Sequence, residues 1–274
     1  MESVRTSWNT QNGTKIFGQY WKPANPRAVV VQVHGLGEHS GRYQHVADLF
    51  GQHGLAFLGY DHHGHGRSEG KRGHIPNYEV LMEELDLALA EAAKLFPGIP
   101  QVIYGHSWGG NMALNYLIRR QPKVACAIVT DPWLHIPKVP AIQKSMAKFM
   151  NNIFPSLTQN NGLDAKNLSH DPKVVEAYEK DPLVHPKISV RNFVDSDAAA
   201  EYALGNAAKV SVPLLLMHGD ADKITLSSGS QEFQKTWKGK HRLKIWPGLY
   251  HEIHNEPEKG EVLKEMLGWI EENL

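Results

Sequence analysis

One serine in the sequence is placed as a nucleophile would be. The run Gly-His-Ser-Trp-Gly at residues 105–109, centred on Ser107, follows an apolar segment (101–104) typical of a buried strand. It opens a segment with helical periodicity, residues 108–120. A serine on such a strand-to-helix turn exposes its hydroxyl for attack on a carbonyl carbon. The glycine spacing alone is a weak signal, but this context disfavours a simple helix N-cap.

A serine hydroxyl is a weak nucleophile, so it needs a base, and the base needs an acid to orient it. In folds built on this turn the chain order is serine, acid, histidine. The histidines that follow the late acid are His241, His251 and His254. His251 lies in a loop after the last predicted strand and is the predicted base. His254 is the fallback, and His241, which abuts a strand, is expected to be structural.

Three aspartates compete for the role of acid. Asp222 stands in a loop after a predicted strand, where it can meet the ring of His251, and is the preferred choice. Asp220 lies beside a turn glycine and is expected to bond nearby backbone amides. Asp131 precedes a proline and is expected to shape a turn.

The negative charge that develops on the attacked carbonyl oxygen needs two backbone donors. One predicted donor is the amide of Trp108, the residue after the nucleophile. The other comes from the His-Gly-Leu-Gly loop at residues 34–37, where the amide of Leu36 is preferred. These groups together predict acyl transfer with no metal and no organic cofactor.

Apolar segments and helical segments alternate along the chain, which predicts a mostly parallel, doubly wound sheet. An antiparallel hairpin around Asn12 and Gly13, formed by residues 4–8 and 15–21, adds two strands at one edge and brings the expected sheet to eight. The buried strands are predicted at 28–34, 55–60, 101–106, 124–130, 212–218 and 242–246. The helices are predicted at 43–53, 78–96, 108–120, 226–237 and 257–274.

The alternation stops between Asp131 and Ala208, a stretch interrupted by prolines and without a clear strand. It is predicted to be a helical cap inserted into a core formed by residues 1–130 and 209–274. Such insertions lie above the carboxyl ends of the strands, where ligands bind. Residues 138–154 are predicted to form an amphipathic helix with interleaved lysines. Its apolar face is expected to line a channel, and transient contact with a membrane or micelle is a second hypothesis.

The whole-chain composition narrows the class of protein. The 274 residues carry 29 basic and 29 acidic side chains, so nothing points to a nucleic-acid partner. Cys126 is the only cysteine, and its apolar context predicts a core residue. The first ten residues lack an apolar signal segment, and no apolar run has membrane-spanning length. A cytoplasmic location, with peripheral contact at membranes, is therefore expected.

With these residues in place, the sequence resembles the monoacylglycerol lipase family, whose members have the α/β-hydrolase fold. The resemblance runs nearly end to end and is weakest in the cap. It is carried by the runs at 34–43, 61–70, 105–110, 219–224 and 251–254. It implies hydrolysis of a monoacylglycerol, a lipid ester, to fatty acid and glycerol. It also implies that Glu38, Arg42 and His254 bind the glycerol end, although Glu38 and Arg42 could instead be an ion pair that supports their loop.

Three departures from the family pattern affect expected substrate preference. Trp108 replaces the usual methionine, and its ring is expected to narrow or reshape the acyl tunnel. His63 stands where arginine is common, and Thr225 where vertebrate members have a cysteine near the acid. The alternatives are a lysophospholipase, a general short-chain carboxylesterase, or a non-catalytic receptor on a hydrolase scaffold.

Overall fold

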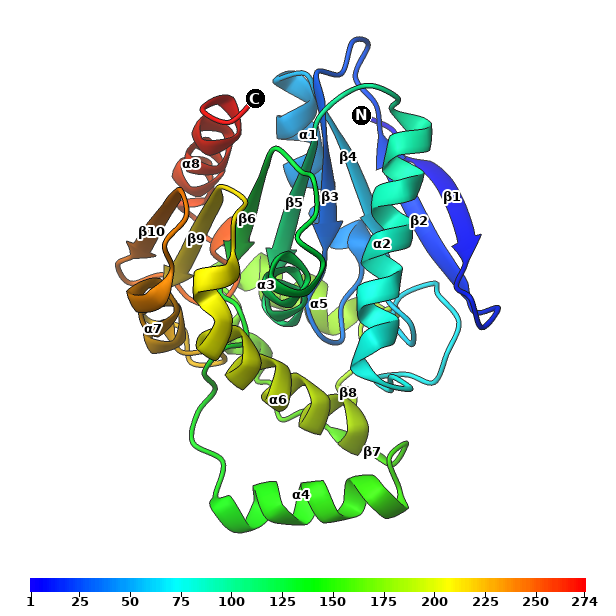
Figure 1. Cartoon of the computed structure of the whole chain (residues 1–274), viewed down its shortest axis with the longest axis vertical. Helices are drawn as coiled ribbons and strands as arrows, with labels where there is room; N and C mark the ends of the chain where they lie inside the picture. Colours follow the sequence, from blue (N-terminus) through cyan, green and yellow to red (C-terminus); the bar gives the residue numbers. More distant parts are fainter.

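The computed structural model describes residues Met1 to Leu274, and its central feature is one eight-stranded sheet in the order β1-β2-β4-β3-β5-β6-β9-β10 (Figure 1). The β1–β2 and β2–β4 pairs are antiparallel, and the others are parallel. The predicted α/β-hydrolase sheet is thus confirmed. Its strands are β1 (Val4–Asn9), β2 (Lys15–Trp21), β3 (Ala28–Val33), β4 (Leu55–Tyr60), β5 (Gln101–His106), β6 (Cys126–Thr130), β9 (Leu214–Gly219) and β10 (His241–Trp246).

The central strands are nearly continuous in apolar residues because helices cover both faces of the sheet. In β3, Val29, Val31 and Val33 point into one core cluster, whereas Ala28 and Val30 point into the other. This alternation is the period of two that a strand imposes on its side chains. Every residue of β3 is buried, so the strand shows no polar face in the sequence.

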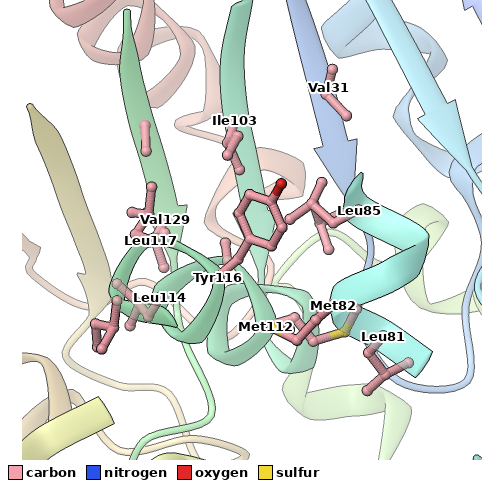
Figure 2. Close-up of a cluster of buried hydrophobic side chains, with 14 of the residues drawn as sticks. Val31, Leu81, Met82, Leu85, Ile103, Met112, Leu114, Tyr116, Leu117 and Val129 are labelled. Carbon is pink, nitrogen blue, oxygen red and sulfur yellow. The ribbon is translucent and has the colours of Figure 1, made fainter. Parts of the chain in front are cut away.

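The helices of the core divide between the two faces of the sheet. Residues of α1 and α8 pack in one cluster, and residues of α2, α3 and α7 pack in the other. Figure 2 shows the second cluster, where Met112 and Leu117 of α3 and Leu85 of α2 meet strand valines and isoleucines. The core helices are α1 (Gln44–Gln52), α2 (Tyr78–Leu95), α3 (Trp108–Arg120), α7 (Ser227–Thr236) and α8 (Lys259–Glu271), with short 3-10 turns η1 (Ser40–Tyr43), η3 (Ala207–Lys209) and η4 (Ile253–Asn255).

The N-terminal hairpin forms as predicted. Val4 pairs with Tyr20 and Asn9 with Lys15 across the turn, and Gly13 adopts φ 85°, which favours glycine. Other predicted boundaries are off by a few residues. β6 begins at Cys126 rather than at residue 124, and β9 begins at Leu214 because Pro213 has no amide proton for the ladder.

The segment between β6 and β9 contributes no strand to the eight-stranded sheet. It holds α4 (Ala141–Ile153), η2 (Ala165–Asn167), α5 (Pro172–Lys180) and α6 (Val190–Asn206). In Figure 1, α6 runs beneath the core, and α4 lies still further from the sheet. The prediction that this stretch has no strand was wrong. β7 (Thr158–Asn160) pairs with β8 (Lys187–Ser189) in a separate two-stranded sheet.

Cys126 is completely buried in β6, and burial raises the pKa of its thiol to about 12. Among the helices, none combines the length and the apolar character that crossing a bilayer requires.

Candidate active site

Ser107 occupies a strained turn between β5, which ends at His106, and α3, which begins at Trp108. Its backbone has φ 57° and ψ −119°, a conformation that a non-glycine residue adopts at a cost of about 1–3 kcal/mol. The turn is tight, because a Cβ atom on Gly109 would lie 2.1 Å from the carbonyl oxygen of Val33. This backbone conformation places the serine side chain at the surface of a cavity.

The structure brings Ser107, His251 and Asp222 together from distant parts of the chain. Nε2 of His251 lies 2.8 Å from Oγ of Ser107, and Nδ1 lies 2.7 Å from Oδ2 of Asp222. The three residues follow β5, β9 and β10, whose carboxyl ends meet at one edge of the parallel sheet. This connected pair of hydrogen bonds is the geometry by which an imidazole takes a proton from a serine.

The charges of the pair favour a base held by an ionised acid. Burial opposes protonation of His251, but the charge of Asp222 and its hydrogen bond outweigh burial and raise the pKa of the imidazole. Burial of Asp222 acts in the other direction, yet His251 and a hydrogen bond from His218 hold the pKa of the carboxyl well below its usual range. Asp222 therefore stays ionised and stabilises the imidazolium form of His251.

The competing aspartates take other roles. Oδ1 of Asp220 accepts a hydrogen bond of 2.6 Å from the amide of Gly248, the local backbone role expected for it. Oδ1 of Asp131 accepts from the amide of Gly219 at 2.8 Å, and Asp131 has no hydrogen bond to His251. Its φ of 47° fits the predicted turn. His241 is exposed, and its ring stacks on Trp237.

The two predicted backbone donors flank Ser107. The amide of Leu36 donates to no other group of the protein, and Leu36 lines the cavity beside Ser107. Trp108 is the first residue of α3, and its amide has no partner within the helix because the first-turn amides lack one. Both amides are therefore free to bind a developing oxyanion.

The side chain of Trp108 does not narrow the cavity, which corrects the expectation from its size. The ring is fully buried and is not part of the cavity lining. Its Nε1 donates to Oγ of Ser196 on α6 at 2.8 Å, and its face stacks on His65, with ring centres 5.1 Å apart. The indole fills a space between α6 and the loop after β4 instead of the path of a substrate.

A cavity of about 1000 Å³ opens in front of Ser107 and His251. Much of its lining is apolar and comes from the segment between β6 and β9, including Trp133, Ile142, Met146, Met150 and Phe193. This volume is at the upper end of ordinary small-molecule sites, and one long acyl chain fits within it.

The polar part of the lining is a cluster around Arg42. Nη1 of Arg42 lies 2.7 Å from Oε2 of Glu38 and 2.6 Å from Oε1 of Glu252, and Nη2 lies 2.8 Å from Oε2 of Glu252. The ring of Tyr178 on α5 lies 4.8 Å from the guanidinium carbon. Glu38 and Arg42 therefore line the cavity and also form the ion pair that the sequence left open.

Glu252 was missed by the sequence analysis. Burial opposes its ionisation, but the charge of Arg42 lowers the pKa of Glu252 to about 2. Its position next to His251 was the only available signal, because Arg42 is 210 residues away in the chain.

His254 does not reach the cavity, in contrast to the expected contact with substrate. Its ring is buried against Tyr43, with centres 5.0 Å apart, and against His106 at 4.7 Å. It is absent from the lining. Burial lowers its pKa to about 3, so the ring is neutral, and it supports Tyr43 beneath Glu38, whose Oε1 accepts from the Tyr43 hydroxyl at 2.8 Å.

Comparison with known proteins agrees with this geometry. The family model described as serine aminopeptidase, S33 (Hydrolase_4) matches residues 24–258. The chain is 36% identical to a Mycolicibacterium smegmatis monoacylglycerol lipase over 96% of this chain and 95% of that protein. It is 32% identical to phospholipase YtpA of Bacillus subtilis, over 89% and 95% of the two chains.

A solved structure extends the similarity. The monoacylglycerol lipase of Paleococcus ferrophilus superposes with a TM-score of 0.85 at 34% identity, and each chain is covered completely. One relative is much longer: the chain spans 27% of an uncharacterized abhydrolase domain-containing protein of Dictyostelium discoideum, to which it is 38% identical. The chain belongs to the serine aminopeptidase S33 (Hydrolase_4) family of α/β-hydrolases and, within it, groups with the monoacylglycerol lipases.

Proposed function

We propose that the chain hydrolyses monoacylglycerols to a free fatty acid and glycerol, with Ser107, His251 and Asp222 as its catalytic triad. The observation that carries this proposal is the hydrogen-bonded series from Asp222 to Ser107 at the wall of a cavity that is largely apolar but contains the Arg42 cluster. An apolar tail and a hydroxyl-rich head match such a lining.

In the acylation step, Oγ of Ser107 attacks the ester carbonyl while Nε2 of His251 takes its proton. Asp222 orients the ring and stabilises its charged form. The amides of Leu36 and Trp108 bind the oxyanion, and one such donor contributes on the order of a hundredfold in rate. His251 then gives its proton to the departing glycerol oxygen. In the second step His251 activates a water, which releases the fatty acid from Ser107.

The Arg42 cluster supports glycerol over a phosphate-bearing head group. Arg42 is already bound by Glu38 and Glu252, so the cluster has an excess of one negative charge. A phosphodiester would place another negative charge beside it, which is unfavourable, whereas hydroxyls can donate to the remaining carboxylate lone pairs. The other charged lining residues, Asp164 and Lys223, are exposed and opposite in sign. This disfavours a lysophospholipid whose phosphate would lie beside Glu38 and Glu252.

The segment 131–208 is assigned to a cap over the site. Its helices supply much of the apolar lining and contribute nothing to the main sheet. Two contacts support a fixed position of cap residues 181–185 against the core. The amide of His185 donates to the carbonyl of Gly37 at 2.9 Å, and Nε2 of His39 lies 2.9 Å from Asp181. α4 has no buried residue, and Nζ of Lys144 ties it to Asp197 of α6 at 2.7 Å.

The apolar residues of α4 that do not line the cavity are assigned to contact with a lipid surface. Phe149 and Ile153 are 61% and 50% exposed, and Phe154, 57% exposed, extends this apolar surface beyond the helix. Apolar side chains of this size are stabilised when they enter the acyl boundary of a bilayer. We assign the protein to the cytoplasm, with transient binding at membranes or micelles through α4.

The test is fatty-acid release from monoacylglycerols, diacylglycerols, lysophosphatidylcholine and p-nitrophenyl esters, with Ser107→Ala as the control. Preference for monoacylglycerol that is lost in Ser107→Ala supports the proposal. Activity on p-nitrophenyl esters alone would replace it with a general carboxylesterase. No turnover that depends on Ser107 would favour a receptor role.

A further inference from the structure

A second buried imidazole contacts Asp222. His218 lies near the end of β9, and its side chain is completely buried. Its Nε2 is 3.3 Å from Oδ2 of Asp222, the same oxygen that His251 uses, and 3.3 Å from the carbonyl oxygen of Thr225. Its Nδ1 is 2.8 Å from Oγ of Ser230 on α7.

These neighbours fix the protonation of the ring. A carboxylate and a carbonyl can only accept hydrogen bonds, so the nitrogen that faces them must carry a hydrogen. The hydroxyl of Ser230 can donate, which leaves Nδ1 as the acceptor. The neutral Nε2–H tautomer of His218 thus satisfies both sides of the ring.

Nε2–H of His218 can donate a hydrogen bond to Oδ2 of Asp222 when the Thr225 hydroxyl does not. The Thr225 hydroxyl lies 2.8 Å from Oδ2 of Asp222 and 3.0 Å from the carbonyl of Asp131, and its single hydrogen can serve only one of them. Oδ1 of Asp222 accepts from the amides of Ile224 and Thr225. The Nε2–H of His218 faces both Oδ2 of Asp222 and the carbonyl of Thr225, each at 3.3 Å, so it supplies Oδ2 with a second, shared donor whichever way the Thr225 hydroxyl turns.

Asp131 also lies near the ring of His218 but does not compete with Asp222 for its Nε2–H. Its Oδ1 is 4.0 Å from Nε2 of His218, and its Oδ2 is buried without a partner. Burial and the charge of Asp222 raise the pKa of Asp131 well above its usual value, which disfavours a second negative charge beside Asp222. His106 is a further titratable neighbour. Burial lowers the pKa of its imidazole, so its ring is neutral.

The cluster is not a metal site, although one side-chain nitrogen or oxygen from each of Asp131, His218 and Asp222 lies within 4.8 Å of the other two. The lone pairs of Asp222 already accept from His251, His218 and backbone amides. A cation at Oδ2 would have to displace the hydrogen bond of His251. Two imidazoles, His251 and His218, therefore share the carboxylate oxygen Oδ2 of Asp222.

We propose that His218 is a positioning residue of the triad, whose Nε2–H bond to Asp222 fixes the carboxylate toward His251 and divides its charge between two rings. This inference rests on the triad assigned under the proposed function, but not on the identity of the ester. If it is correct, loss of the His218 donor leaves more of the Asp222 charge to His251, which then holds its proton more tightly.

Two variants of His218 separate positioning from packing. Gln places an amide nitrogen at the level of the imidazole Nε2, whereas Asn is too short to donate to Asp222. In His218→Asn the acid limb of the kcat/KM profile on p-nitrophenyl butyrate should move up by about 0.5–1 pH unit, as expected for one hydrogen bond. At the plateau, kcat should fall several-fold and KM should change little. In His218→Gln the limb should stay at the wild-type pH.

An unshifted limb in His218→Asn, or equal shifts in both variants, would overturn the proposal. Nitrogen-15 NMR of the wild-type protein tests it without a variant. A protonated Nε2 and an unprotonated Nδ1 on His218 support it, and the reverse tautomer overturns it. Because p-nitrophenyl butyrate needs only the triad, failure to cleave monoacylglycerol would sink the proposed substrate without deciding this question.

Discussion

At the scale of single residues, chemistry depends on a few side chains held against their local preferences. Ser107 keeps a left-handed backbone, and Asp222 keeps its charge while buried. Each is stabilised by its neighbours: close packing around Gly109 for the serine, and several donors for the aspartate. The most direct measure of this arrangement is the proton affinity of His251.

We expect the acid limb of the kcat/KM profile to lie above pH 6.5, the ordinary pKa of histidine. Because the pKa of His251 is raised, its imidazole takes up a proton at a pH above 6.5 as the pH is lowered. A protonated imidazole cannot act as a base. The profile should be measured on a monoacylglycerol, whose own charge does not change in this range. A limb centred below pH 6 would show that Asp222 does not control His251.

Glu252→Gln should separate the head-group site from the triad. The change removes a charged partner of Arg42, and such a contact contributes about 1.5–3 kcal/mol, so kcat/KM on monoacylglycerol should fall roughly 10- to 100-fold. Hydrolysis of p-nitrophenyl butyrate at alkaline pH should fall less than about threefold. Glu258→Gln, an exposed glutamate in the same loop region, is the matched control. Equal losses on both substrates would contradict a glycerol-binding role.

At the scale of elements, the sequence predicts those helices and strands whose local pattern of apolar residues determines them. Buried strands such as β3 are recognised because apolar residues fill both faces. β7 and β8 escape because three residues are too few for a period, and their pairing depends on contacts such as the amide of Asn161 with the carbonyl of Pro186. The roles of Glu252 and His218 escape for the same reason: their partners are brought near only by the fold.

The apolar face of α4 is wider than the part that the cavity uses. Met146 and Met150 line the cavity, whereas Phe149 and Ile153, on the same face of the helix, do not and are at least half exposed. The helix therefore contributes to the cavity wall while leaving part of its apolar face in water. An exposed face of this kind usually marks a binding surface.

The double variant Phe149→Ser with Ile153→Ser should bind phosphatidylcholine vesicles at least about tenfold more weakly, because two apolar side chains no longer enter the bilayer. Cosedimentation with vesicles measures the partitioning, and turnover of dissolved p-nitrophenyl butyrate should be unchanged. Asn152→Ser, an exposed polar position on α4, serves as the control. Partitioning equal to that of the wild type would remove α4 from the membrane proposal.

At the scale of the whole molecule, stability depends on the protonation of a buried acid, Asp131. The raised pKa of Asp131 contributes stability that is fully present below its ordinary pKa of 3.8 and is lost as pH rises through the folded-state value. The protein thus becomes less stable toward alkaline pH through a group that takes no part in the proposed reaction.

Asp131→Asn should remove that dependence. The amide oxygen can still accept from Gly219, and no charge can form. Relative to wild type, the free energy of unfolding of the variant should increase as the pH rises above about 3.8, the ordinary pKa of aspartate, until the folded-state pKa of Asp131 is passed. Urea denaturation across this range measures the difference. A constant difference at every pH would mean that Asp131 is ionised in the folded protein.

The solitary, inaccessible Cys126 makes the natural chain a clean background for thiol labelling. Because the thiol is completely buried and its pKa is about 12, reagents such as maleimides and nitroxides find no target in the folded protein at neutral pH. A single cysteine introduced by Lys148→Cys, at an exposed position of α4, would then carry the only reporter on the molecule. Spin-label mobility or fluorophore emission at that site could follow the cap as it meets lipid, with no native residue to remove first.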